Sequence, residues 1–257
     1  MTQPRAPRLC VLIDADNIPC AHAEAIFEEI AGLGEASVRR IYGDWSAQRL
    51  AGWAKKVNSL GLVADQQFAN TKGKNASDIG LVIAAMDFLH SGLFDGFVLV
   101  SSDSDFTRLA SRIREQGLDV YGIGEKKTPE AFRNACKRFI YVENLGAEEA
   151  PAPMVETGSE AQPSTPSTAM PSAPAPAASG KLAPPQAIPL VVAAMKRIGL
   201  EEDWYSLGQI GQFITQANPD FDTRTYGCAK LSDLLRKTGR FEVKQGQGNH
   251  LMVRDKA

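Results

Sequence analysis

The sequence lacks the patterns that mark zinc proteins, disulfide-stabilised domains and membrane proteins. Its 4 cysteines include no C-x-x-C pair, and none of its 3 histidines lies at zinc-ligand spacing from them, so we predict buried thiols rather than zinc ligands or disulfides. No apolar run approaches the length of a membrane span, and Leu9–Ile13 is already interrupted by Asp14. These absences favour a cytoplasmic protein with no membrane partner.

The chain also lacks a strong charge of either sign. Its formal net charge is −2 over 257 residues. Residues 1–146 hold 17 basic and 18 acidic side chains, whereas residues 186–257 hold 10 and 8. No overall basic field therefore indicates nucleic acid, and any such partner must bind to a local patch.

Composition divides the chain into three parts. Residues 151–185 contain 9 of the 15 prolines, many Ala, Ser and Thr residues, and no aromatic residue. Such a segment cannot bury enough apolar surface to offset the entropy lost on ordering. We therefore predict one domain over residues 1–146, a disordered linker over residues 147–185 and a second domain over residues 186–257.

In the first domain, apolar strand patterns alternate with helical ones, which predicts an α/β fold. Strands are expected at Arg8–Ile13, Ala36–Tyr42, Leu62–Phe68, Phe97–Val100, Leu118–Ile123 and Phe139–Val142. Helices are expected around Ile26–Ile30, over Ala47–Leu60, over Ile79–Leu89, where Ile79, Val82, Ile83, Met86 and Leu89 recur at helical spacing, over Phe106–Gln116 and from Pro129. This alternation predicts a mostly parallel sheet with helices on both faces.

Aspartates follow two of these strands and begin one of the helices. Asp14 ends the first strand, Asp103 and Asp105 follow Phe97–Val100, and Asp78 begins the third helix. In parallel sheets, ligands bind outside the carboxyl ends of the strands, so we expect these carboxylates at one edge. They would repel one another unless cations were bound. An oxygen-only ligand set favours Mg²⁺ or Mn²⁺.

Such a metal site can activate water for attack on a phosphodiester, so no protein nucleophile is required. We therefore assign Asp14, Asp78, Asp103 and Asp105 as candidate catalytic and metal-ligating residues. The alternative is helix capping, because aspartate is common at strand-to-helix turns. On that interpretation Asp16 is the leading candidate for a pure cap, and Asp105 could cap the helix that starts at Phe106.

Four short motifs resemble the NYN domain, a branch of the PIN-like nuclease superfamily. They are Ile13–Asn17, Tyr42–Trp45, Gly73–Asp78 and Ser101–Phe106, and the resemblance covers roughly residues 8–145. It implies a three-layer α/β/α fold, divalent metal held by aspartates, and ribonuclease activity, which we take to be endonucleolytic.

Carried over by position, the resemblance implies the same four aspartates as metal-site acids and Asn17 as a supporting polar residue. Ser102 stands where the family commonly has glycine. Lys72, Lys74 and Arg108 lie near the predicted edge and are candidates for RNA phosphate contacts. A solvated surface is the alternative for these three residues.

The C-terminal pattern predicts a small winged helix, because helices precede a hairpin with a glycine-rich turn. Helices are expected at Ala187–Ile198, Leu207–Ala217 and Tyr226–Thr238, and strands at Phe241–Lys244 and His250–Val253. The run Lys230–Val243 resembles the OST-HTH (LOTUS) domain. That resemblance implies RNA binding or, as in some members, a protein partner.

Candidate RNA contacts in this domain are Lys230, Arg236, Lys237 and Arg240, with a solvated helix face as the alternative. Together the patterns predict a metal-dependent ribonuclease tethered to an RNA-binding module, which would raise the local substrate concentration. One rival is a non-catalytic RNA-binding adaptor. The other is a phosphatase of the haloacid dehalogenase type with Asp14 as nucleophile, although the full D-x-D-x-T/V motif is missing. The oligomeric state is left open.

Overall fold

The computed structural model describes residues 5–46, 48–66, 76–146, 181–199, 203–246 and 250–257. Lys72, Lys74 and most of the predicted linker lie outside these ranges. Within them, every helix is too short or too polar to cross a lipid bilayer.

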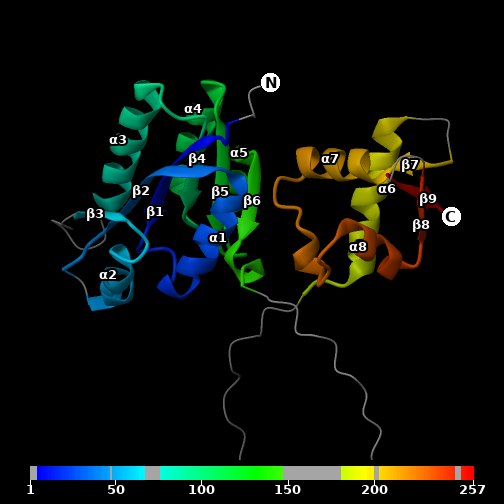
Figure 1. Ribbon diagram of the computed structural model, residues 1–257, viewed down its shortest axis with the longest axis horizontal. Coiled ribbons are helices and arrows are strands. Elements are labelled where there is room, and N and C mark those ends of the chain that lie inside the picture. The colour runs from blue at the N-terminus through cyan, green and yellow to red at the C-terminus, as the bar shows by residue number, and fades with distance from the viewer. Residues whose placement is uncertain (1–4, 47, 67–75, 147–180, 200–202, 247–249) are drawn as a thin grey trace, which may run out of the picture. The chain divides into compact units, whose positions relative to one another are not determined.

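The N-terminal domain is built on a six-stranded sheet with the order β3-β2-β1-β4-β5-β6, and each neighbouring pair is parallel (Figure 1). The strands are β1 Arg8–Asp14, β2 Glu35–Gly43, β3 Val63–Gln66, β4 Gly96–Val100, β5 Asp119–Gly124 and β6 Arg138–Tyr141. The helices between them are α1 Ala23–Leu33, α2 Ala51–Val57, α3 Ala76–Ser91, α4 Thr107–Glu115 and α5 Glu130–Ala135. The predicted α/β fold is confirmed.

Both faces of the sheet are covered by helices. Alternate residues of β1 point to opposite faces, as the pleat requires. Val11 packs in one core with Ile26 of α1 and Trp53 of α2. Leu12 packs in the other core with Leu81 of α3. The domain therefore has three layers, with α1 and α2 on one face and α3, α4 and α5 on the other.

The buried face of α3 matches the predicted apolar series only in part. Ile79 and Ile83 are 62% and 58% exposed, whereas Leu81, Ala85 and Leu89 face the core. Apolar residues occur on most sides of this helix, so two faces have helical spacing. Ala85 has no exposed surface, and its small side chain lets α3 approach the sheet closely.

Two further predicted helices start later than expected. The segment predicted as a helix from Ala47 instead has a 3-10 turn at Gln48–Leu50, and α2 follows at Ala51–Val57. Before α4, a 3-10 turn at Ser104–Phe106 replaces the expected α-helical start. Both turns tighten the chain at the edge where the strands end.

The strand order creates a switch point between β1 and β4. The chain leaves β1 towards β2 and β3 on one side, and continues from β4 to β5 and β6 on the other. Ile13 is in register with Val100, so Asp14 and Ser101 emerge next to each other. A crevice outside such a switch point is where open α/β sheets bind ligands.

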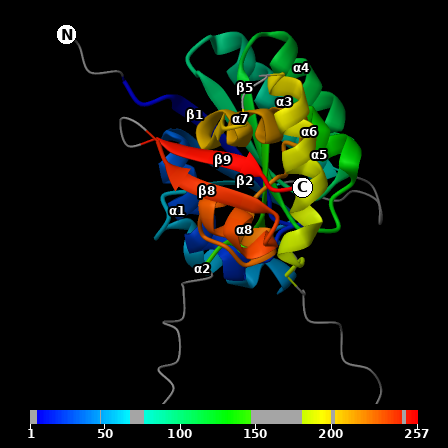
Figure 2. The same ribbon diagram turned by 90° about the vertical axis from the view of Figure 1, so that its right-hand side faces the viewer.

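Over its described residues, the C-terminal domain has three α-helices and a three-stranded antiparallel sheet, as a winged helix does. The helices are α6 Ile188–Ile198, α7 Leu207–Ala217 and α8 Leu231–Thr238, and the strands are β7 Tyr205–Ser206, β8 Phe241–Gln245 and β9 Leu251–Asp255. The order is β7-β9-β8, and Figure 2 shows β8 and β9 side by side.

Two features of this domain depart from the prediction. The short strand β7 was not expected. The predicted helix Tyr226–Thr238 begins only at Leu231, because Gly227 has a left-handed backbone (φ 68°) that ends the preceding 3-10 turn, Thr223–Tyr226. A new helix then starts after Lys230.

Candidate metal centre

Asp14 is the most buried of the candidate acids, with only 1% of its surface exposed. Its carboxylate accepts hydrogen bonds from Asn17 Nδ2 at 2.6 Å, Ser101 Oγ at 2.9 Å and the Asp16 backbone N–H at 3.2 Å. Burial raises the pKa of Asp14 above its usual value, although these donors act in the opposite direction. Asn17 and Ser101 thus fix the orientation of a carboxylate at the end of β1.

Ser101 connects the two acidic motifs. Its buried hydroxyl donates to Asp14 Oδ2 and accepts the backbone N–H of Asp103 at 3.0 Å. Ser101 was not among the residues predicted from the sequence to form the site. The available signal was its place as the first polar residue after the fully buried strand β4.

Asp103 caps the turn that follows Ser101. Its Oδ1 accepts the Asp105 backbone N–H at 2.9 Å, at the start of the 3-10 helix Ser104–Phe106. The cap in this turn is therefore Asp103 rather than Asp105. The Asp105 side chain is exposed at the same edge.

Asp78 lies in the first turn of α3, and the negative charge of the other acids affects its pKa. Its pKa is raised to about 6, first by burial and then by repulsion from Asp14, Asp103, Asp105 and Asp16. Asp78 is thus within electrostatic range of the other three motif aspartates and of Asp16, which belong to two other segments of the chain. The donors are all oxygen atoms and their charge is incompletely compensated, which fits a hard divalent cation.

The side chains of these acids do not converge as a complete set of metal ligands. In the part of the chain that the structure describes, no three Asp, Glu, His or Cys side chains are grouped as a metal site. Asp14 is held in place, whereas Asp103 is partly exposed and Asp105 exposed. Asp14 thus lies deepest, and Asp103 and Asp105 lie nearer the surface, at the rim.

The predicted capping role of Asp16 is wrong. Neither the 3-10 turn Cys20–His22 nor α1 begins with a side-chain cap. Asp16 Oδ1 instead pairs with Arg49 Nη2 at 3.0 Å. This ion pair places a guanidinium beside the acidic region.

A hollow of about 460 Å³ lies next to the acids. Its lining includes Asp16, Asn17, Arg49, Glu125 and Lys127. The Lys127 ammonium contacts Glu125 and is largely exposed. The hollow thus combines two basic groups with Asp16 of the acidic region, and a polyanion could span both.

The basic residues singled out from the sequence differ in their availability. Arg108 is exposed in the first turn of α4. Lys72 and Lys74 lie outside the described residues. Arg49 and Lys127 could not be singled out from the sequence, because neither belongs to one of the four motifs and only the fold brings them to the same hollow.

In the C-terminal domain, three of the four candidate contacts are exposed. Lys230 precedes α8, and Arg236 and Lys237 lie in its last turn. Arg240 is engaged, because its guanidinium donates to both carboxylate oxygens of Asp255 at 2.8 and 2.7 Å. An RNA phosphate would have to compete with this bidentate pair.

Ser101→Ala should lower stability, because it removes a donor to buried Asp14 and leaves the Asp103 N–H without that acceptor. We expect a loss of about 1–3 kcal/mol in the free energy of unfolding, the usual cost of unsatisfied buried polar groups. Ser104→Ala, at an exposed position three residues away, is the matched control and should change stability by less than about 0.5 kcal/mol. Equal effects in urea unfolding would contradict the bridging role of Ser101.

Comparison with known proteins identifies both parts of the chain. The NYN domain model matches residues 8–143, and the OST-HTH/LOTUS domain model matches residues 186–253. No curated protein matches the sequence.

Two solved structures are similar to parts of the chain. A crystal structure of a protein of unknown function from Vibrio parahaemolyticus is 18% identical, with a TM-score of 0.45, and covers 54% of this chain and 94% of its own. A solution NMR structure of an uncharacterized protein from Nitrosomonas europaea is 29% identical, with a TM-score of 0.26, and covers 37% and 93%. Neither likeness bears on function.

Proposed function

Because this chain belongs to the NYN domain family, within a nuclease superfamily, we propose that it is a metal-dependent ribonuclease with a tethered RNA-binding module. The observation that carries the proposal is the buried Asp14 carboxylate at the end of β1, which the Ser101 hydroxyl links to the Asp103 turn after β4. The raised pKa of Asp78, caused first by burial and then by repulsion from Asp14, Asp103, Asp105 and Asp16, supports it. Such a concentration of like charge is unfavourable without a cation.

Asp14, Asp78, Asp103 and Asp105 would hold Mg²⁺ or Mn²⁺. A bound divalent ion supplies Lewis-acid activation of water and neutralises the charge that develops on the phosphate during in-line displacement. Asn17 and the other donors to Asp14 keep its carboxylate pointed at one place. The acids at the rim would turn inward when the ion binds.

Arg49 and Lys127 would hold phosphates on either side of the cleaved bond. Both line the hollow next to the acids, and neither is a candidate metal ligand. Their role is to hold the polyanion against a negatively charged centre. Without such cations, RNA would be repelled by the same carboxylates that bind the metal.

The C-terminal domain would bind RNA and raise its local concentration at the NYN domain. The supporting observations are the OST-HTH/LOTUS match and three exposed basic residues, Lys230, Arg236 and Lys237. A protein partner in place of RNA is the alternative outcome of the binding measurements below.

The test is cleavage by the purified full-length chain. Single-stranded RNA, structured RNA and DNA, each labelled internally, are incubated with Mg²⁺, with Mn²⁺ and with EDTA. We expect internal cuts in RNA that require the metal. If every RNA remains intact with either metal while binding is still observed, the protein is a non-catalytic adaptor and the ribonuclease proposal fails.

Lys127→Ala should weaken substrate binding at the NYN domain without altering the chemical step. We expect KM to rise about tenfold with kcat nearly unchanged, because a charge-assisted contact made equally in the ground state and the transition state is lost. Lys126→Ala is the matched control. It removes the same charge at the neighbouring residue, whose side chain does not line the hollow. If both variants raise KM equally, the effect is general electrostatics and not a phosphate contact at Lys127.

A further inference from the structure

The outer face of the C-terminal sheet carries an aromatic ring with two cations close to it. On the inner face, Phe241 and Val253 are buried in the domain core. On the opposite face, Lys244 is in register with Met252, and Met252 is in register with Ser206 of β7. Trp204 immediately precedes β7 and lies beside this row.

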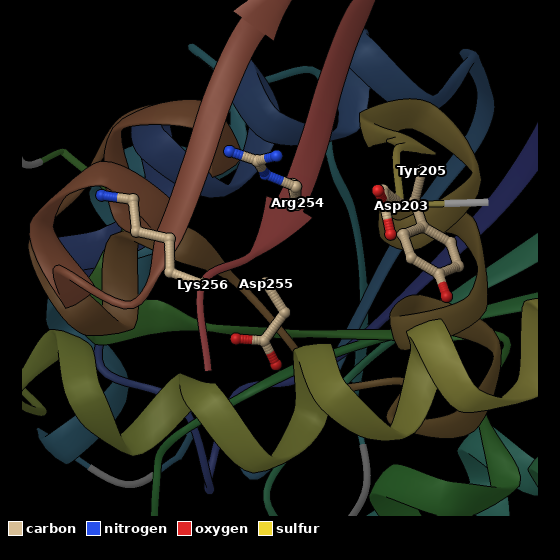
Figure 3. Close-up of a pocket in the computed structure, with 5 residues that line it drawn as sticks. All are labelled: Asp203, Tyr205, Arg254, Asp255 and Lys256. Carbon is tan, nitrogen blue, oxygen red and sulfur yellow. The ribbon is translucent and has the colours of Figure 1, made fainter.

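The two cations approach the indole ring of Trp204 closely. Lys244 Nζ lies 3.5 Å and Arg254 Cζ 4.9 Å from the ring centroid. Trp204 is only partly buried, Lys244 is exposed, and Arg254 pairs with Glu242 across the strands at 2.6 Å. Figure 3 shows the guanidinium of Arg254 pointing away from Asp203 and Tyr205.

A hollow of about 530 Å³ lies beside the ring. It is lined by Trp204, Ser206, Lys244, Gly246, His250 and Met252. At Gly246 a Cβ would come within 2.7 Å of Met252 Cγ, so the absence of a side chain keeps this space open. The hollow offers a flat ring and a thioether, with positive charge at its edge.

This combination suits one unpaired nucleobase and its phosphates. Aromatic rings stack on bases of any sequence, and nearby Lys and Arg side chains bind the backbone. An acidic peptide would explain the cations but not the partly exposed indole and the hollow beside it. Bases in a duplex are stacked and paired, so only a single strand can present one to the ring.

We propose that the outer face of β7, β8 and β9 binds single-stranded RNA by stacking one base on Trp204 and contacting its flanking phosphates through Lys244 and Arg254. This rests on the proposed RNA binding of the C-terminal domain and extends it to a surface separate from α8. The bound base takes the place of the Lys244 ammonium over the ring, and the ammonium moves to the phosphate.

The experiment measures binding of the full-length chain to a labelled 12-nucleotide single strand and to a duplex, in EDTA. Trp204→Ala should raise Kd for the single strand about tenfold, as expected for one lost stacking contact. Trp204→Phe, which retains an aromatic face, should stay within about threefold of the wild type. Kd for the duplex should change less than about twofold. Single-stranded RNA should quench the tryptophan fluorescence of the wild type, and most of that quenching should disappear in Trp204→Phe.

The paired variant Arg236→Ala/Lys237→Ala on α8 separates this inference from the proposed function. If it weakens RNA binding while Trp204→Ala does not, the sheet face is not a base site although the domain binds RNA. Equal weakening of single strand and duplex by Trp204→Ala would also overturn base stacking. If the wild type binds neither RNA, both the inference and the RNA-binding role of the domain fail. Thermal midpoints of all variants, compared with the wild type, establish that the domain remains folded.

Discussion

Asp103→Asn should reduce metal-dependent RNA cleavage about a thousandfold while leaving the protein as stable as the wild type. Removing one anionic ligand takes away several kcal/mol of metal-based charge stabilisation, and each 1.36 kcal/mol corresponds to a factor of ten in rate. Asparagine retains the cap, because its amide oxygen can accept the Asp105 N–H as Asp103 Oδ1 does at 2.9 Å. The substitution therefore removes the negative charge of residue 103 but keeps the hydrogen bond that caps the turn.

The measurement is the single-turnover cleavage rate in Mn²⁺, accompanied by thermal unfolding and by RNA binding in EDTA. Asp87→Asn is the matched control, since Asp87 is an exposed acid on α3 and its loss should leave cleavage unchanged. Wild-type cleavage by Asp103→Asn would show that the activity does not arise at this site. A large fall in stability would mean that Asp103 acts chiefly through its cap.

The layered fold could be predicted because local patterns and global packing agree. Strands such as β4, Gly96–Val100, are buried at every position, which is typical of a parallel sheet covered on both faces. The face of α3 could not be predicted, because Ile83 and Ala85 both belong to apolar series with helical spacing. Packing of the small Ala85 against the sheet decides between them, and this is a tertiary effect.

Only those features of the site that follow from the order of the strands could be predicted. The carboxyl ends of adjacent parallel strands meet, so Asp14 and Asp103 were expected at one edge. The hydroxyl of Ser101 between them, and the pairing of Asp16 with Arg49, depend on how the loops fold over that edge. No spacing in the sequence encodes contacts between a loop after β1 and a loop after β2.

Asp78→Asn should change stability and activity in opposite directions. In the folded, metal-free protein the pKa of Asp78 is about 6, against an ordinary value of 3.8. The folded state therefore holds this proton more tightly than the unfolded state does. The stability contributed by protonated Asp78 is complete below about pH 4 and is lost as the pH rises through 6. Above that range, the ionised carboxylate opposes folding.

Asparagine has no charge for burial to penalise or for the other acids to repel, so the variant should be the more stable protein at pH 7.5 in EDTA. Because Asp78 is incompletely buried, solvent screening reduces the gain to about 1 kcal/mol, or roughly 2–4 °C in Tm for a chain of this size. Near pH 4.5 the two proteins should unfold at nearly the same temperature. Asp87→Asn should show no such pH-dependent difference.

Mn²⁺ should make the wild type more stable than the variant, because the ion binds the folded wild type and stabilises it by mass action. The variant should gain much less from Mn²⁺, and its cleavage rate should fall at least a hundredfold. Thermal scans at pH 4.5 and 7.5 test whether the variant is the more stable protein in EDTA and the wild type the more stable one in Mn²⁺. A variant less stable than the wild type at pH 7.5 in EDTA would mean that the carboxylates do not repel one another. The repulsion is a physical reason to expect a cation here, so that result would also remove one support for the metal centre.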